Sequence, residues 1–172
     1  MPRACLIVLL LLTACHRRPD SEVASYHAVS LDGQNTSLED LRGQVVLLNV
    51  WTLWCLPCRS EMRVLEHLHQ AYEPAGLALV GVNVDARGDI ATVRKFVRSS
   101  GVTYRIWLDP DDTVSSHLPT PGLPATWLIG RDGRIVWGHV GALRPDDPDL
   151  GTALRSALRD QQLARASGGL TS

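Results

Sequence analysis

A Cys-x-x-Cys motif follows a strongly apolar segment of this chain. Residues 44–51 read QVVLLNVW, a continuous apolar and β-branched run that is typical of a strand buried on both faces. Cys55 and Cys58 come next, and from Pro57 to about Gln70 apolar side chains recur at helical spacing. Because proline suits the first turn of a helix, the sequence predicts that the two cysteines lie at a strand-to-helix junction.

Strands and helices alternate along the rest of the chain. We expect a hairpin around Asp32-Gly33 and a short helical turn at residues 38–41 ahead of the buried strand. After the cysteine helix, the sequence predicts a strand at 77–85, a helix at 89–101, a strand at 102–109, a loop at 110–124, a hairpin at 125–140 and a helix at about 149–163. This order predicts an α/β fold whose central mixed sheet is parallel through βαβ crossovers, antiparallel at its end, and covered by helices on both faces.

The first fifteen residues, MPRACLIVLLLLTAC, have the features of an export signal. Arg3 gives a positively charged start, and the apolar run at residues 4–12 is shorter than the roughly 20 residues that a membrane-spanning helix needs. The run ends in Leu-Thr-Ala-Cys, which resembles the lipobox of bacterial lipoproteins. We therefore expect Cys15 to carry the lipid and to become the new N-terminus; a signal cut elsewhere and an uncleaved anchor are the alternatives.

Length and composition indicate one globular domain. A chain of 172 residues with 45% apolar content can bury a sizeable core without covalent crosslinks. We expect a lipoprotein signal peptide at residues 1–14, a tether at 15–25, the folded domain at 26–163 and a flexible tail at 164–172.

The cysteine count favours redox chemistry over a structural disulfide. Of the four cysteines, Cys5 leaves with the signal and Cys15 is taken by the lipid, so Cys55 and Cys58 are left with each other. A disulfide between residues three apart closes a very small loop and removes little chain entropy.

The strand-to-helix junction also gives the two sulfurs different roles. The unpaired N–H groups and the dipole at a helix N-terminus favour a thiolate, so we expect Cys55 to be the nucleophile. Cys58 lies one turn further on the same helical face, where it can attack the mixed disulfide that Cys55 forms with a partner protein.

Several motifs together resemble a known family. WTLWCLPC after a buried strand, LVGVNVD in the middle and GLPATWLIGRDGRIV near the end are similar to the thioredoxin superfamily, and more narrowly to the exported TlpA/ResA/CcmG-like thiol-disulfide oxidoreductases. The similarity runs from Tyr26 to Leu163. It implies a thioredoxin fold with an N-terminal β-hairpin and an extra helix-strand insertion after the active-site helix, a redox-active Cys55–Cys58 disulfide, and no cofactor.

The resemblance also assigns a second part of the site. It implies that Pro124 follows a cis peptide bond and lies against the two cysteines. It further implies that Leu123 pairs its backbone with an extended substrate segment. Around the cysteines, we expect Trp54, Leu56 and Pro57 to shape the surface on which a client docks.

Two positions bear on proton transfer. Thioredoxin has a buried aspartate six residues before its first active-site cysteine, whereas this chain has Asn49, which cannot accept a proton. Glu61 matches a glutamate of the ResA-like branch and could replace that acceptor. The alternative is that Glu61 is one of the acidic residues common in first helical turns.

The other tryptophans are expected to pack in the core or on the sheet: Trp51, Trp107, Trp127 and Trp137.

The direction of electron flow is suggested by the dipeptide between the cysteines. Leu56-Pro57 keeps the proline of thioredoxin, whose potential is about −270 mV against about −120 mV for the oxidant DsbA. The resemblance therefore implies a reductant, with cysteine pairs on apocytochrome c or on copper-centre assembly proteins as clients and a membrane protein as electron donor. The expected location is the periplasmic side of a bacterial membrane, held by the lipid anchor.

Other functions stay open at this point. The same fold could serve as a general disulfide oxidant, or as a Cu(I)-binding chaperone that uses the two thiolates, although only Met62 lies nearby as a further soft ligand. Structural zinc would need ligands beyond the cysteines, and the nearest candidates are His67 and His69 on the same helix.

Two further classes fit the sequence poorly. Thr52 and Cys55 have the Thr-x-x-Cys spacing of peroxiredoxins, but Leu48 stands where that family has a proline. A net charge of −1, with Lys95 as the single lysine, gives no basic stripe and argues against nucleic acid as a partner.

Overall fold

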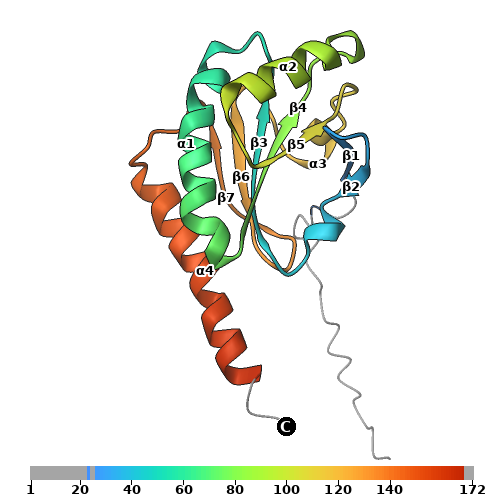
Figure 1. Cartoon of the computed structure of the whole chain (residues 1–172). Helices are drawn as coiled ribbons and strands as arrows, with labels where there is room; N and C mark the ends of the chain where they lie inside the picture. The colour runs from blue at the N-terminus through green and yellow to red at the C-terminus, as the bar shows by residue number, and fades with distance from the viewer. Residues whose placement is uncertain (1–22, 24–25, 169–172) are drawn as a thin grey trace, which may run out of the picture.

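The structure is a computed structural model that describes Val23 and residues 26–168 (Figure 1). Within these residues, seven strands form one sheet in the order β2-β1-β5-β4-β3-β6-β7. The strands are β1 (His27–Ser30), β2 (Asn35–Ser37), β3 (Val45–Trp51), β4 (Leu77–Asn83), β5 (Arg105–Leu108), β6 (Ala125–Ile129) and β7 (Ile135–Val140). The helices are α1 (Leu56–Tyr72), α2 (Ile90–Ser100), α3 (Val114–His117) and α4 (Pro148–Gly168), with 3-10 turns η1 (Glu39–Leu41), η2 (Glu73–Ala75) and η3 (Arg87–Asp89).

The strand pairing confirms the predicted mixed sheet. β3 pairs in parallel with β4, and β4 with β5, through the crossover helices α1 and α2. All other neighbours are antiparallel, including the predicted hairpins β1–β2 and β6–β7. Every residue of β3 and β4 is buried, as their continuous apolar sequences predict.

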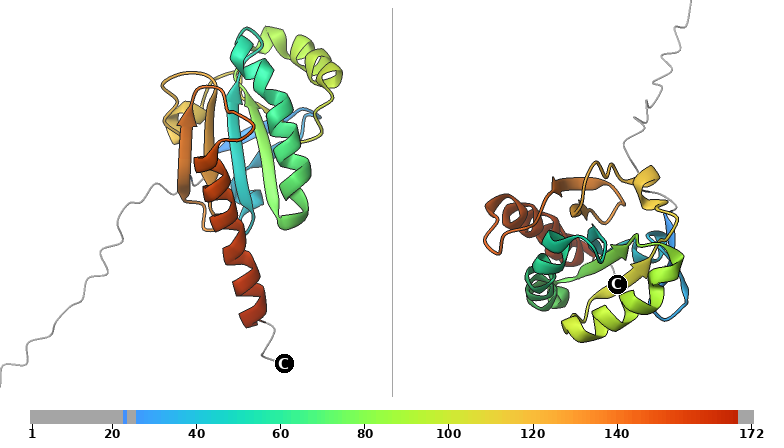
Figure 2. Two further views of the ribbon diagram at one scale, coloured as in Figure 1. Left: turned by 90° about the vertical axis from the view of Figure 1, so that its left-hand side faces the viewer. Right: turned by 90° about the horizontal axis from the view of Figure 1, so that it is seen from above.

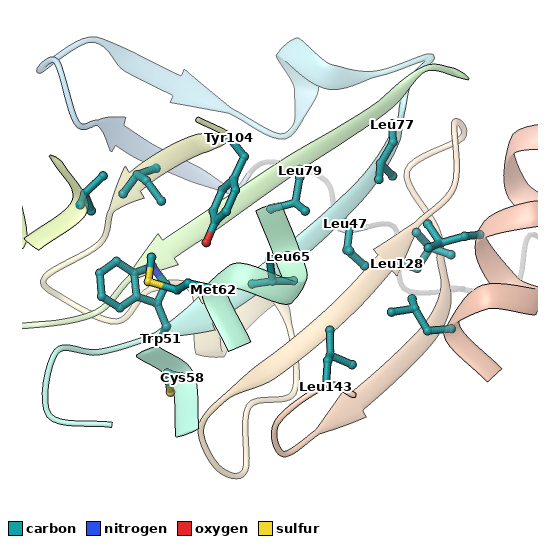
Figure 3. Packing of buried hydrophobic residues seen from close by; sticks show 14 of the residues in the cluster. Leu47, Trp51, Cys58, Met62, Leu65, Leu77, Leu79, Tyr104, Leu128 and Leu143 are labelled. Atoms are coloured by element: carbon teal, nitrogen blue, oxygen red, sulfur yellow. The ribbon is translucent and has the colours of Figure 1, made fainter. Parts of the chain in front are cut away.

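Helices cover the two faces of the sheet unequally. The side chains of α1, α2 and α4 pack into one apolar cluster on one face, and Figure 2 shows these three helices on the same side of the sheet. The smaller α3 and η1 pack into a second cluster on the other face. In Figure 3, Leu47, Leu79 and Tyr104 lie on the face that α1 covers. A fully buried leucine contributes about 2 kcal/mol, so α1 is held firmly against the sheet.

The loop predicted at residues 110–124 contains the short helix α3. Asp109 stabilises the start of this helix, because its carboxylate accepts the backbone N–H groups of Thr113 at 3.1 Å and Val114 at 2.7 Å. An aspartate that satisfies free N–H groups stabilises a helical turn even in a segment rich in proline and serine.

The third central strand is shorter than predicted. β5 begins at Arg105, whereas the sequence predicted a strand from residue 102. The Glu66 carboxylate on α1 accepts the N–H and the hydroxyl of Thr103, both at 2.7 Å. Thr103 is therefore bound to the helix rather than to a neighbouring strand.

The last helix is longer than predicted. α4 extends to Gly168, so residues 164–168 belong to a helix and not to the flexible tail expected from residue 164. The sequence LRDQQLARAS that precedes Gly168 consists largely of good helix formers and contains no glycine or proline.

The folded body begins earlier than predicted. Val23 was expected in the tether at 15–25, but it is buried and its N–H donates to the carbonyl oxygen of Gly133 at 3.2 Å. The expected signal peptide, the lipid-bearing Cys15 and the rest of the tether lie outside the described residues. In the part of the chain that the structure covers, no helix has the length and apolar character needed to cross a membrane.

Candidate active site

The two cysteines lie at the end of β3, where the sheet meets α1. Cys55 has an extended backbone and is the N-cap of α1, and its sulfur accepts the backbone N–H of Cys58 at 3.2 Å. The two residues form a disulfide, with their Cα atoms 5.3 Å apart. The predicted strand-to-helix junction is therefore confirmed, and Cys55 Sγ lies where the helix N-terminus favours negative charge.

The surroundings of the two sulfurs differ. Cys58 is fully buried, whereas Cys55 has 4% of its surface exposed, and Leu56 and Pro57 after it are exposed. Trp54 is 73% exposed. A nearly buried disulfide is thus bordered by apolar side chains that face solvent, an arrangement common at protein-binding surfaces.

The peptide bond between Leu123 and Pro124 is cis, as the resemblance implies. Pro124 stands just before β6, and β6 runs antiparallel to β3 with Ala125 opposite Val50. Because β3 leads into the cysteines, the start of β6 and the Cys-x-x-Cys motif lie at the same end of the sheet. The carbonyl oxygen of Pro124 accepts the N–H of Gly141 at 2.8 Å, which fixes this turn to the segment after β7.

Glu61 is a buried carboxyl group inside the protein. It is 2% exposed and lies beyond the first turn of α1, which contains no acidic residue, so the alternative that Glu61 is an acidic residue of a first helical turn is wrong. Oε1 accepts the side-chain N–H of Asn49 at 2.8 Å, and Oε2 accepts the backbone N–H of Leu143 at 2.8 Å. Burial raises the pKa of Glu61 to about 7, against the opposing effect of these two hydrogen bonds.

Asn49 cannot accept a proton, but it forms hydrogen bonds to two neighbouring side chains. Its Nδ2 donates to Glu61 and also to the Thr126 hydroxyl at 3.0 Å. The sequence singled out Asn49 and Glu61 but missed Thr126 and Leu143. Leu143 contributes only a backbone N–H from 82 positions away, which no side-chain pattern could reveal.

A buried aromatic group lies below α1. Figure 3 shows Trp51 beside Met62 and Tyr104 on the side of the sheet that α1 covers, with Cys58 at the start of α1. The Tyr104 hydroxyl is buried without a hydrogen-bond partner. Burial raises the pKa of Tyr104, and the Glu61 carboxylate raises it further, so Tyr104 stays neutral.

The histidines considered for zinc binding lie on α1, and the threonine considered for peroxidase chemistry follows β3. His67 and His69 lie on α1, and the ring of His69 packs against Tyr104 at 6.3 Å between centroids. Among the described residues, no three His, Cys, Asp or Glu side chains form a group that could hold a metal ion. The Thr52 hydroxyl is buried and makes no hydrogen bond, so it does not hydrogen-bond the Cys55 sulfur.

The remaining tryptophans follow their predicted packing roles. Trp51 and Trp107 are buried in the two apolar clusters, and Trp127 and Trp137 are partly buried against them.

Comparisons with known proteins agree with this arrangement. The AhpC/TSA family profile matches residues 17–138. The thiol-disulfide oxidoreductase ResA of Bacillus subtilis strain 168 is 33% identical over 123 residues, which cover 72% of this chain and 68% of that protein. ResA of Bacillus thuringiensis strain Al Hakam is 31% identical over 120 residues, which cover 70% of this chain and 68% of that protein.

Solved structures show the same fold. A structure from Chlorobium tepidum, described as a thiol:disulfide interchange protein DsbE, superposes with a TM-score of 0.74 at 27% identity, over 81% of this chain and 96% of that one. A secreted thiol-disulfide isomerase from Corynebacterium glutamicum gives a TM-score of 0.70 at 29% identity, over 83% of this chain and 84% of that one. The fold is therefore the thioredoxin fold.

Proposed function

This chain belongs to the AhpC/TSA family as a thiol-disulfide oxidoreductase of the ResA type, and on that basis we propose that it reduces disulfides of client proteins outside the cytoplasm. The observation that carries the proposal is a Cys55–Cys58 pair at a helix N-terminus with the buried carboxyl group of Glu61 one turn further on.

The reaction begins with the reduced protein. The Cys55 thiolate attacks one sulfur of the client disulfide, and the other client sulfur leaves as a thiolate. Cys58 then loses its proton and attacks Cys55 Sγ, which releases the second client sulfur. Two electrons pass to the client, and the protein is left with the Cys55–Cys58 disulfide. A membrane protein that carries electrons from the cytoplasm would reduce this disulfide again.

Glu61 accepts the proton in the second step. A thiol as fully buried as Cys58 holds its proton tightly, because burial disfavours the thiolate. A carboxyl group with a pKa of about 7 is half ionised near neutral pH and is suited to accept and return a proton there. Asn49 and the Leu143 N–H hold it in place.

The client docks on the apolar surface around Cys55. Trp54, Leu56 and Pro57 supply exposed contact area, and the backbone of Leu123 beside the cis bond pairs with an extended client segment. Clients would be proteins with cysteine pairs, of the kind found on apocytochrome c or on copper-centre assembly proteins. The apolar border supports a protein client over a small disulfide.

We assign the protein to the periplasmic side of a bacterial membrane, anchored through Cys15. The supporting observations are the lipobox-like LTAC at residues 12–15 and a structural relative that is named as secreted. In cells fed labelled fatty acid, the wild-type chain should incorporate label and Cys15→Ser should not. Label that still enters the variant would contradict this assignment.

Trapping tests the division of labour between the sulfurs. Cys58→Ser should accumulate protein adducts through Cys55 that dithiothreitol releases, because the resolving thiol is missing. Cys55→Ser removes the nucleophile and should form none while keeping the fold. Equal adduct yields from the two variants would overturn the assigned roles, and the trapped proteins would identify the client class.

A redox titration of the Cys55–Cys58 pair tests the direction of electron flow. A potential near that of thioredoxin, about −270 mV, supports a reductant. A potential near about −120 mV would make the protein an oxidant instead.

A further inference from the structure

The loop before the nucleophile has few backbone hydrogen bonds of its own. Residues 52–54 connect β3 to Cys55 and belong to neither a strand nor a helix. Within this loop, the Cys55 N–H reaches the carbonyl oxygen of Thr52 only at the long distance of 3.4 Å. The short contact is made by Leu53, whose N–H donates to Oδ2 of Asp85 at 2.7 Å.

Asp85 is held in place by the end of β4. It is 7% exposed, and the same Oδ2 atom accepts the side-chain N–H of Asn83 at 2.7 Å. Asn83 in turn accepts the backbone N–H of Asp85 through its Oδ1 at 3.3 Å. Asn83 is paired with Trp51 across β3 and β4, which anchors this polar group to the centre of the sheet.

A hydrogen bond from a backbone N–H to a carboxylate is about twice as strong as one between neutral groups. The hydrogen bond from Leu53 to Asp85 fixes the orientation of the Leu53 peptide plane. Trp54 and Cys55 follow within two residues. The orientation of Leu53 therefore sets where the exposed indole and the N-cap sulfur lie relative to α1.

We propose that Asp85 is a positioning residue for thiol-disulfide exchange, which holds the 52–55 loop through Leu53 so that Cys55 stays at the helix N-terminus in an attacking geometry. The proposal rests on the proposed role of Cys55 as the nucleophile. A purely structural Asp85 would stabilise the end of β4 without affecting the rate at which Cys55 reacts.

The test uses the reduced full-length chain and iodoacetamide at pH 7, with peptide mapping to show which sulfur is alkylated. Asp85→Ala removes the acceptor of the Leu53 N–H, and alkylation of Cys55 should slow about tenfold, since small misplacements of a reacting group have effects of this size or larger. Asp85→Asn keeps an oxygen that can accept both N–H groups, so it should restore the rate to within about twofold of wild type.

Asp109→Ala is the matched control. Asp109 is also a buried aspartate after a strand, and its carboxylate accepts the N–H groups of Thr113 and Val114 at the start of α3 and the Tyr26 hydroxyl. Its backbone N–H donates to the carbonyl oxygen of Asn83 at 2.9 Å, and alanine keeps that bond. The Asp109→Ala substitution should lower the free energy of unfolding without slowing the alkylation of Cys55. If Asp85→Ala does not fold, Asn83→Ala, which removes a hydrogen bond that orients Asp85, should slow the reaction in its place.

Different results would contradict the role of Asp85 and the assignment of Cys55 as the nucleophile. A wild-type rate in folded Asp85→Ala, or an Asp85→Asn variant as slow as Asp85→Ala, would overturn the role of Asp85. Alkylation of Cys58 in place of Cys55 in the wild-type protein would instead overturn the proposed assignment of the nucleophile.

Discussion

At the scale of single residues, burial of Glu61 determines the pH at which its carboxyl group can act, because burial raises its pKa while the hydrogen bonds from Asn49 and Leu143 oppose that rise. Both oxygens of Glu61 accept hydrogen bonds, so the group is fixed in orientation whether or not it carries a proton. Its raised pKa of about 7 means that near neutral pH it exists in both forms. The rate of the step that uses it should therefore change with pH in that range.

Glu61→Gln should slow the resolution step. In the wild type, release of the client by Cys58 should speed up as the pH rises through about 7, because only the ionised carboxylate can accept the proton. In the variant, this inflection should be absent and the rate above pH 7 lower by about 100-fold. Stopped-flow measurement with a synthetic disulfide peptide separates this phase from the initial attack by Cys55, which should change little. An unchanged second phase would remove Glu61 from the mechanism.

Glu61 should also make stability depend on pH. The pKa of Glu61 in the folded protein, about 7, exceeds the ordinary value of 4.5. Below about pH 4.5 the folded and unfolded states both hold the proton, so burial of a charged carboxylate costs the wild type no stability. As the pH rises from 4.5 to 7, the unfolded chain releases the proton while the folded protein keeps it. The free energy of unfolding should fall over this window by on the order of 3 kcal/mol and then level off.

Urea unfolding of the oxidised protein at pH 4.5, 6 and 8 measures this window. Glu61→Gln should lack this component of the pH dependence, although its stability at any one pH also reflects altered hydrogen bonds. The Asn49 amide can rotate to present its oxygen to the new Gln side chain, which keeps the variant folded. Parallel pH profiles for the two proteins would contradict the raised pKa.

The two cysteines have a local signal in the sequence, whereas the cis peptide bond before Pro124 and the interest in Glu61 came from the resemblance to known oxidoreductases. For Asn49, the comparison with thioredoxin showed that the residue cannot accept a proton, but it did not reveal the groups that Asn49 binds. Thr126 and Leu143 reach Asn49 and Glu61 through tertiary contacts 77 and 82 positions along the chain, so no local pattern marks them.

At the scale of strands and helices, the sequence-based predictions are wrong where side-chain hydrogen bonds compete with the regular backbone pattern. β3, β4 and α1 were predicted closely, because buried strands and an amphipathic helix have strong periodic signals. β5 and α3 were not, because Glu66 binds Thr103 and Asp109 binds the N-terminus of α3. Such hydrogen bonds depend on the fold and override local propensity.

The β6–β7 hairpin depends on a glycine beneath a tryptophan. Trp127 of β6 lies opposite Gly138 of β7, and a methyl group on Gly138 would come within 2.1 Å of the ring. Gly138→Ala should therefore force the indole to move and lower the free energy of unfolding by about 2 kcal/mol. Tryptophan fluorescence during urea unfolding measures both effects.

Gly122→Ala is the control for this change. A methyl group there would lie 3.5 Å from Val140, an ordinary contact, so stability should change by less than about 0.5 kcal/mol. Equal effects of the two substitutions would show that Trp127 adjusts without cost and that Gly138 is not required.

At the scale of the whole molecule, the first described residue lies far from the redox site. Val23 binds Gly133 in the turn after β6, and Ile129 at the end of β6 pairs with Val46 at the start of β3. The cysteines follow the opposite end of β3. With Cys15 as the proposed lipid-bearing residue, residues 16–22 span at most about 25 Å, so the membrane would face the end of the sheet remote from the cysteines.

Val23 should therefore act as part of the folded body. It is 4% exposed and packs in the apolar cluster with Leu38, Leu41 and Val46. Val23→Ala should lower the free energy of unfolding by about 1.5 kcal/mol, because it removes two buried methyl groups and leaves a cavity. Val29→Ala on β1 is the matched control: that valine is 38% exposed, so its loss should matter by less than about 0.5 kcal/mol in the same urea titration. If both substitutions had the same small effect, Val23 would contribute nothing to the fold, and the domain would begin at Tyr26 as the sequence predicted.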